Sequence, residues 1–267
     1  MNNDIYIKPM TPTRRTKIDE GFKTFYIKWR FKRIITMVKK ENKKMKEFIQ
    51  NEIDTISNDN CMDYMKIMPD ECVNLTLTDI PYGKVNRDSN GLRVLDKEQA
   101  DVMTFKMNEF LNEVYRVTNG TIIIFCGKEQ LSEIYEFFSD MQKKGKGTVR
   151  QLIWEKSNPS PMNGQYIYLS GIENAVWFKK RGGSFNAHCK NTVFKYSCGR
   201  SKLHPTEKNH NLLKELILDN SNEGDIVFDP CAGSGSHLLV AKENNRHYLG
   251  VELNKEYFKI ACNNVLH

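Results

Sequence analysis

The sequence contains no run of about 18 apolar residues, which excludes a membrane-spanning helix. None of its seven cysteines forms a Cys-x-x-Cys pair, and their odd number argues against a disulfide framework and against a zinc ribbon. The first ten residues, MNNDIYIKPM, hold no apolar stretch of the signal-peptide type. We therefore expect a reduced, cytoplasmic protein that binds no metal and no membrane.

The charge of the chain is unevenly distributed. The 267 residues carry a net charge of +7, and 39% of them are hydrophobic, which is enough for one sizeable core with an appendage. Residues 1–50 hold 14 Lys and Arg against 5 Asp and Glu, or +9, so the other 217 hold 26 against 28, or −2. This division predicts a basic N-terminal extension over 1–50, a nearly neutral domain over 51–267, and a polyanionic partner.

From residue 51 onward, the hydrophobic pattern alternates between strands and helices. Strands are expected at 73–78, 121–126, 149–155, 174–179, 225–228 and 247–252. This alternation predicts an α/β fold whose sheet has helices on both faces and binds ligands at the carboxyl ends of its strands.

The helices between these strands are marked by their caps. The helix that carries Met103 to Val117 is expected to close at Asn119-Gly120, and the next is expected to stop near Gly145. Thr206 and Asn254 are expected to cap the last helices before and after the 225–252 segment. Residues 180–203 lack helical periodicity and are rich in Gly, Lys and Arg, so we expect an exposed basic loop region there.

The loop Phe228-Asp-Pro-Cys-Ala-Gly-Ser-Gly-Ser236 follows a predicted strand and opens a helix. Its small residues let the backbone approach a ligand, and no Lys follows Gly235, so it is not a phosphate-binding P-loop. Glu252 ends the next strand, where a carboxylate can accept both hydroxyls of a ribose. These features favour a nucleoside cofactor without a bound pyrophosphate, although a tight turn without any ligand has the same local pattern.

A second loop, Asp79-Ile-Pro-Tyr-Gly83, also follows an apolar strand. A carboxylate, a rigidly directed backbone carbonyl and an aromatic ring together suit a planar base that carries an amino group. The two acceptors match the two N–H bonds of the amine, and the ring offers a face for stacking.

These two loops, with His204-Pro-Thr-Glu-Lys208 between them, occur in an order that resembles the β class of DNA amino-methyltransferases. The resemblance covers the chain from about Asp54 to the C-terminus. It implies a Rossmann-like S-adenosylmethionine-dependent methyltransferase fold with a mixed, mostly parallel sheet. It also implies S-adenosyl-L-methionine as the cofactor and double-stranded DNA as the partner.

The resemblance assigns roles residue by residue. The target-amine loop is Asp79, Ile80, Pro81 and Tyr82, with Asp79 and the carbonyl of Ile80 as acceptors and Tyr82 stacking on the base. The cofactor-binding residues are Asp229, Pro230, Gly233, Gly235, Glu252, Pro205, Thr206, Lys208 and Asn60. Among these, Glu252 holds the ribose and Lys208 lies near the cofactor carboxylate. Asn60 stands where many relatives have Asp, so the contact to the cofactor's adenine is either absent or made by Asn60.

In the family, Asp at the first loop position goes mostly with adenine N6, so Asp79 favours a site-specific adenine-N6 methyltransferase. Alternatives are a cytosine-N4 enzyme, or a nucleic-acid-binding protein that has lost catalysis. RNA or a protein glutamine is a further alternative substrate. Pro230-Cys231 and Glu173-Asn174 are similar to elements of cytosine 5-position enzymes, but Cys231 lies inside the cofactor loop and cannot also serve as the nucleophile.

The resemblance also implies how DNA is held. The target base has to be flipped out of a duplex to reach a pocket at a sheet edge. The recognition region of the β class corresponds here to about residues 180–203, which is short, so the basic extension is a second candidate for DNA contact. The other expected partner is a cognate restriction endonuclease, and the chain is expected to act as a monomer or a homodimer.

Overall fold

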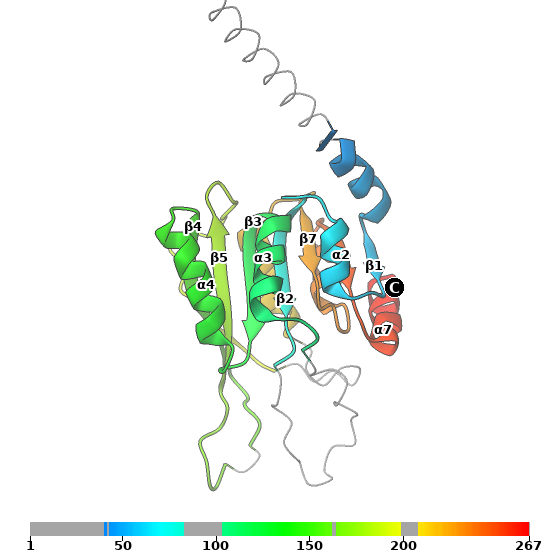
Figure 1. Ribbon diagram of the computed structural model, residues 1–267. Helices are drawn as coiled ribbons and strands as arrows, with labels where there is room; N and C mark the ends of the chain where they lie inside the picture. Colours follow the sequence, from blue (N-terminus) through cyan, green and yellow to red (C-terminus); the bar gives the residue numbers. More distant parts are fainter. Residues whose placement is uncertain (1–39, 42, 83–102, 162–163, 199–207, 267) are drawn as a thin grey trace, which may run out of the picture. The chain divides into compact units, whose positions relative to one another are not determined.

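A computed structural model gives the structure of the chain (Figure 1). The structure describes residues 40–41, 43–82, 103–161, 164–198 and 208–266. Contacts divide the chain into two units, Met1–Glu47 and Phe48–His267, and the described residues of the first unit are helical. Within the described ranges, no helix is both long enough and apolar enough to cross a membrane.

The second unit is built on one sheet of eight strands. The strands are β1 (Thr55–Ser57), β2 (Val73–Asp79), β3 (Thr118–Cys126), β4 (Gly147–Lys156), β5 (Ile172–Lys180), β6 (Val193–Tyr196), β7 (Ile226–Asp229) and β8 (His247–Val251). Their order across the sheet is β1-β8-β7-β2-β3-β5-β4-β6. Only β5 runs against its neighbours, and every other pairing is parallel. The predicted mixed, mostly parallel sheet is therefore confirmed.

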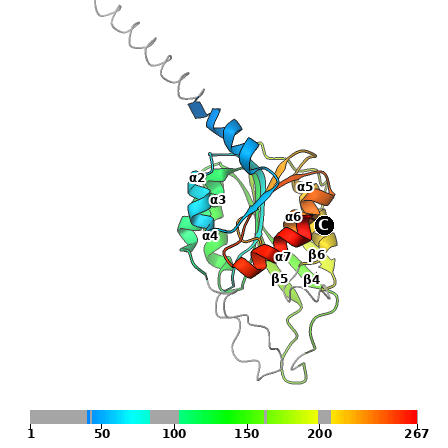
Figure 2. The same ribbon diagram turned by 90° about the vertical axis from the view of Figure 1, so that its right-hand side faces the viewer.

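Helices cover both faces of the sheet (Figure 2). One face carries α2 (Cys61–Ile67), α3 (Met107–Val117) and α4 (Leu131–Lys143), and the other carries α5 (His210–Asn220), α6 (Ser236–Glu243) and α7 (Lys255–Leu266). Burial follows the 3.6-residue period that the sequence shows: Phe110, Leu111 and Val114 of α3 are completely buried. As predicted, Asn254 caps α7, because its side-chain oxygen accepts from the backbone N–H groups of Glu256 and Tyr257.

The expected closure of α3 at Asn119-Gly120 is wrong. The helix ends at Val117, and β3 begins at the next residue, so both residues belong to the strand. Glycine is required at position 120 because β2 lies too close for a side chain, and not because the backbone makes a left-handed turn. A Cβ atom at this position would lie 2.2 Å from the carbonyl oxygen of Asn74 on β2, so only glycine lets the two strands approach.

The expected cap of α5 is also wrong. The helix begins at His210, and its N-cap is Asn209, whose side-chain oxygen accepts from the backbone N–H groups of Asn211 and Leu212. An Asn at this position competes well with Thr as a cap. Thr206 itself lies outside the described residues.

The 180–203 region is not entirely an exposed loop. Strand β6 lies within it and pairs with β4 at the edge of the sheet. Lys180 is buried, and its ammonium lies 4.0 Å from the centroid of the Tyr115 ring. Lys190 is bound to Asp219 on α5 at 2.7 Å. Part of the basic charge in this region is therefore used inside the fold, a use that a count of lysines cannot predict.

Candidate active site

The predicted site residues follow the carboxyl ends of neighbouring parallel strands. Asp79 ends β2, Asp229 ends the adjacent β7, Glu252 follows β8, and Asn60 lies in the connection after β1. Since these four strands run in the same direction, their following loops share one edge of the sheet. The structure therefore brings together two loops that are about 150 residues apart in the sequence.

Lys208 lies with its side chain between Asp79 and Tyr82 of the target-amine loop, in contact with both. Its side chain is only 3% exposed, and its Nζ lies 2.7 Å from Oδ2 of Asp79 and donates to the Tyr82 hydroxyl at 3.0 Å. Burial lowers the pKa of Lys208, but the negative charges of Asp79 and Glu173 outweigh it and raise the pKa well above its usual value. The lysine therefore stays charged beside Asp79. Its place near the cofactor carboxylate, which the resemblance implies, stays a prediction.

The same ammonium binds a second carboxylate. Lys208 Nζ lies 2.6 Å from Oε2 of Glu173 on β5, and the other oxygen of Glu173 lies 2.6 Å from Nζ of Lys156 on β4. Burial raises the pKa of Glu173, but the two lysines outweigh it, so the pKa is lowered. We call the alternating series Asp79, Lys208, Glu173 and Lys156 the ion chain. Its two cations and two anions cancel, which is how a protein can hold one buried and three partly buried charged groups together.

The ion chain engages only one oxygen of Asp79. Its other oxygen, Oδ1, is buried and has no hydrogen-bond partner within the described part of the chain. An unpaired buried acceptor is costly, and such atoms in native proteins usually have a functional reason. Oδ1 is therefore an acceptor ready for a donor other than the described residues.

The backbone of the target-amine loop is fixed from the end of β3. Ile80 is buried and donates its N–H to the carbonyl of Phe125. The Gln130 side chain donates to the carbonyl of Pro81 at 2.8 Å and accepts from the N–H of Gly127 at 2.9 Å. Burial, followed by the charge of Asp79, raises the pKa of Tyr82, so this side chain remains a neutral phenol. The loop is therefore held in place before any ligand binds.

Asp229 joins the two loops. Its side chain is completely buried, and its Oδ1 accepts from the Thr78 hydroxyl at 2.7 Å and from the N–H of Cys231 at 3.0 Å. Its Oδ2 lies 2.5 Å from Nδ1 of His237 on α6. Thr78 directly precedes Asp79, so Asp229 ties the strand of the target-amine loop to the loop predicted to bind the cofactor.

The predicted cofactor loop needs glycine at two positions. Gly233 and Gly235 have φ values of +53° and +79°, in the left-handed region that favours glycine. Gly235 is also the N-cap of α6, and a Cβ atom there would lie 3.1 Å from Ala261 on α7. Pro230 lies between Asp229 and these glycines and is buried. The small residues therefore serve both the turn and the packing of α6 against α7.

Glu252 is oriented by the loop it faces. Its Oε2 accepts from the N–H of Gly233 at 2.8 Å, and its Oε1 accepts from the N–H of Asn254 at 2.7 Å. Each carboxylate oxygen keeps a further lone pair for a hydroxyl. Burial raises the pKa of Glu252, while these backbone donors act in the opposite direction. Asn60, in contrast, uses its side-chain oxygen to cap α2 at the N–H of Met62.

The sequence-based assignment omitted residues that the structure places in the site. Glu173 and Lys156 join Asp79 through Lys208, and Gln130 fixes the loop backbone. Glu173 stood out only for its likeness to an element of another enzyme class, and nothing in the spacing of Lys156 or Gln130 indicates a shared site. Pro205 and Thr206, both predicted to bind the cofactor, lie outside the described residues.

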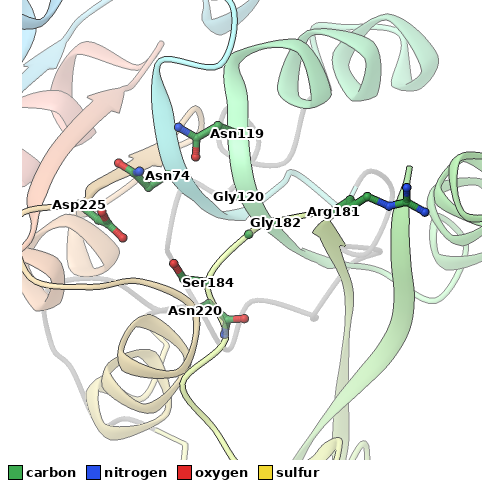
Figure 3. Close-up of a pocket in the computed structure, with 9 residues that line it drawn as sticks. Asn74, Asn119, Gly120, Arg181, Gly182, Ser184, Asn220 and Asp225 are labelled. Carbon is green, nitrogen blue, oxygen red and sulfur yellow. The ribbon is translucent and has the colours of Figure 1, made fainter. Parts of the chain in front are cut away.

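A polar cavity of about 310 Å³ lies at the opposite edge of the sheet (Figure 3). Its lining residues are Asn74, Asn119, Gly120, Arg181, Gly182, Gly183, Ser184, Asn220 and Asp225. Asn74 accepts from the N–H of Ile226, and Asn220 accepts from the indole N–H of Trp177. Figure 3 shows the Arg181 side chain directed away from the other lining residues. These amides form hydrogen bonds within the protein and connect neighbouring elements of the fold. The cavity lies at the opposite edge of the sheet, so it is separate from the candidate site.

The fold and the two loops at its carboxyl edge define the class of the protein, a Rossmann-like α/β methyltransferase. The family model described as DNA methylase, of the N6/N4 methyltransferase type, matches residues 73–263. The chain therefore belongs to this DNA methylase family.

Individual relatives agree with this membership. The Type II methyltransferase M.HinfI of Haemophilus influenzae is 28% identical over 255 residues, which cover 81% of this chain and 69% of the relative. The Type II methyltransferase M2.DpnII of Streptococcus pneumoniae is 25% identical over 228 residues, which cover 74% of this chain and 84% of the relative.

Solved structures share the fold. The M1.HpyAVI–SAM complex superposes with a TM-score of 0.59 and 26% identity, covering 78% of this chain and 98% of that one. The cytosine-N4-specific PvuII DNA methyltransferase has a TM-score of 0.61 at 16% identity, over 80% and 86% of the two chains, and supports the fold alone.

Proposed function

We propose that this protein transfers a methyl group from S-adenosylmethionine to the exocyclic N6 of an adenine in double-stranded DNA. The observation that carries the proposal is the free, buried Oδ1 of Asp79, beside an oxygen that Lys208 holds. Membership of the DNA methylase family supports the reaction and the polymer. Asp79 at the head of the target-amine loop supports adenine over cytosine.

The residues around Gly233 and Gly235 suit the proposed cofactor. The segment from Asp229 to Ser236 contains no Lys or Arg, as expected for a ligand without a pyrophosphate. Asp229 and Glu252 place acidic groups near a loop that would receive a sulfonium cation. Glu252 would hold the ribose through the lone pairs that its backbone donors leave available. The bound cofactor would supply an electrophilic methyl group, as the M1.HpyAVI structure's SAM complex suggests by similarity.

In the proposed mechanism, the protein makes a poor nucleophile reactive. The lone pair of an exocyclic amine is delocalised into the base, so the amine attacks slowly in its planar form. Asp79 Oδ1 and the carbonyl of Ile80 would accept the two amine hydrogens and favour the pyramidal form. Tyr82 would stack on the base, and a proton would leave toward Asp79. No covalent intermediate with the protein is needed.

Incubation of the purified protein with plasmid DNA and methyl-labelled S-adenosylmethionine tests the proposal. After digestion to nucleosides, the label should appear on N6-methyladenine. Label on N4-methylcytosine would instead establish the cytosine alternative. If RNA or a protein glutamine carries the label and DNA does not, that molecule is the substrate instead of DNA. No transfer to any of them would leave a binding protein without activity.

A cognate restriction endonuclease would be the functional partner of such an enzyme, as the Type II methyltransferase relatives suggest. The setting we propose is the cytoplasm, in agreement with the seven free thiols of the chain. Either a monomer or a homodimer would suit the reaction, because all proposed catalytic groups come from one chain.

Deletion of residues 1–45 is expected to weaken DNA binding and to flatten its dependence on salt. The extension over 1–50 carries +9, and each phosphate contact that is lost removes about one unit from the slope of log K against log[salt]. The measurement is DNA affinity from 50 to 200 mM salt, with cofactor affinity as the internal control. An unchanged salt slope would show that the extension does not bind DNA.

Cofactor affinity is expected to fall as the pH drops below the raised pKa of Glu252. The ionised carboxylate accepts both ribose hydroxyls, whereas the protonated group loses an acceptor. Because burial raises this pKa, the loss should begin at a higher pH than for an ordinary Glu. Calorimetry between pH 4.5 and 8 measures it, and Glu252→Gln should bind weakly with a flatter profile. Identical pH profiles for the wild type and Glu252→Gln would show that Glu252 does not bind the cofactor.

A further inference from the structure

The loop between β4 and β5 presents an apolar group of side chains to solvent. Tyr166, Ile167, Tyr168 and Leu169 are 80%, 61%, 101% and 41% exposed, and we call these four residues the loop tip. Four consecutive large apolar side chains are seldom left in water without a binding role. The whole loop, residues 157–171, contains no charged side chain, so it would not repel a polyanion.

This loop projects from the edge of the sheet that carries Asp79. In the register of the sheet, Asp79 lies beside Phe125 of β3, and Phe125 lies beside Ala175 near the start of β5. The loop therefore enters β5 two strands away from Asp79, at the same edge. Figure 1 shows it extending beyond the ends of the strands, below the sheet in that view.

The base of the loop is fixed, although its tip is exposed. Lys156 donates its N–H to the carbonyl of Gly171 at 2.8 Å, which closes the hairpin, and the Asn158 side chain accepts from the N–H of Cys198 at 2.6 Å. The Lys156 side chain is also the last member of the ion chain that ends at Asp79. Contacts that fix the base of the loop therefore also connect it to the proposed catalytic carboxylate.

We propose that the loop tip is a DNA-contacting wedge, with Tyr168 stacking against the bases left behind when the target adenine flips out. The inference rests on the proposed function and names an element outside the 180–203 region. Flipping costs the stacking of the target base, and apolar or aromatic side chains inserted into a base stack offset such a cost. A fully exposed Tyr at the target edge has the chemistry for this role.

The test compares Tyr168→Ala with Tyr168→Phe, which keeps the ring, and with Tyr135→Ala. Tyr135 is an exposed tyrosine on α4 and serves as the matched control. The substrates are a duplex taken from the methylated region of the plasmid and the same duplex with an abasic site opposite the target adenine. DNA affinity is measured by fluorescence anisotropy and methyl transfer as kcat/KM, with cofactor affinity measured in parallel.

For the matched duplex, Tyr168→Ala should lower kcat/KM and affinity about 5- to 150-fold, the range of one lost base–aromatic stack. The loss should be smaller with the abasic duplex, where flipping is easier. Tyr168→Phe and Tyr135→Ala should behave like the wild type, and cofactor affinity should not change. Unchanged binding and transfer in Tyr168→Ala, or an equal loss with both duplexes, would overturn the wedge. If the wild type transfers no methyl group, the proposed function fails. The affinities of the wild type and the variants for the intact plasmid DNA then test the loop, and an unchanged affinity of Tyr168→Ala would overturn the wedge.

Discussion

Replacing Asp79 with alanine is expected to lower kcat for DNA methylation by about 10²- to 10⁴-fold, the range seen when a positioned proton acceptor is lost. Oδ1 of Asp79 is buried and available, and the side chain is the acceptor on which the proposed mechanism depends. Cofactor affinity should change little, because Asp79 ends β2 and the predicted cofactor loop follows β7. Single-turnover transfer and calorimetric binding measure the two effects separately.

Two further variants sharpen this expectation. Asp79→Asn keeps a side-chain oxygen but loses the charge, so it should retain more activity than alanine and less than the wild type. Asp63→Ala removes an exposed aspartate that pairs with Lys66 on α2, and it should have normal activity. A kcat for Asp79→Ala within a few-fold of the wild type would mean that another group receives the amine proton.

Replacing Lys208 with methionine is expected to lower the free energy of unfolding by about 3–5 kcal/mol, as when one partner of a buried ion pair is removed. The variant would leave Asp79 without its cation and would leave Glu173 with Lys156 alone. Equilibrium denaturation by urea measures this loss.

Comparison with a second pair isolates the burial effect. Lys195 and Glu155 are 2.6 Å apart but exposed, so Lys195→Met should leave the stability almost unchanged. Adding Asp79→Asn to Lys208→Met should recover part of the lost stability, because it removes the unpaired charge. Equal stabilities of Lys208→Met and Lys195→Met would contradict a stabilising role of the buried Lys208 in the ion chain.

Much of the sheet could be predicted because its strands have clear apolar patterns, alternating in 73–78 and continuous in 121–126. The segments 73–78 and 121–126 correspond closely to β2 and β3, and the two short loops of the site follow β2 and β7 as expected. The errors occurred where one residue type has two physical uses. Gly120 indicated the end of a helix, but it lies in β3, where only glycine lets β3 approach β2. Thr206 is a suitable N-cap residue, but the N-cap of α5 is Asn209.

The polar partners of the site could be predicted less well than its loops. The resemblance placed Lys208 near a cofactor carboxylate but did not indicate the two protein carboxylates, Asp79 and Glu173, that it contacts in the structure. Pairings of this kind depend on the register of β5 against β3 and β4. A reversed strand changes which side chains meet without changing the hydrophobic pattern, so the sequence does not show that Glu173 belongs to the site.

The reversed direction of β5 also bears on how such a protein can diversify. A parallel neighbour of β4 would need a crossover of a dozen or more residues, whereas an antiparallel one needs only a hairpin loop. Doubling the length of a flexible loop adds only about 0.6 kcal/mol of closure entropy. The 157–171 segment is therefore a place where residues can be inserted or exchanged at small energetic cost. If the loop tip contacts DNA as proposed, such changes would alter which DNA the protein accepts without changing its fold.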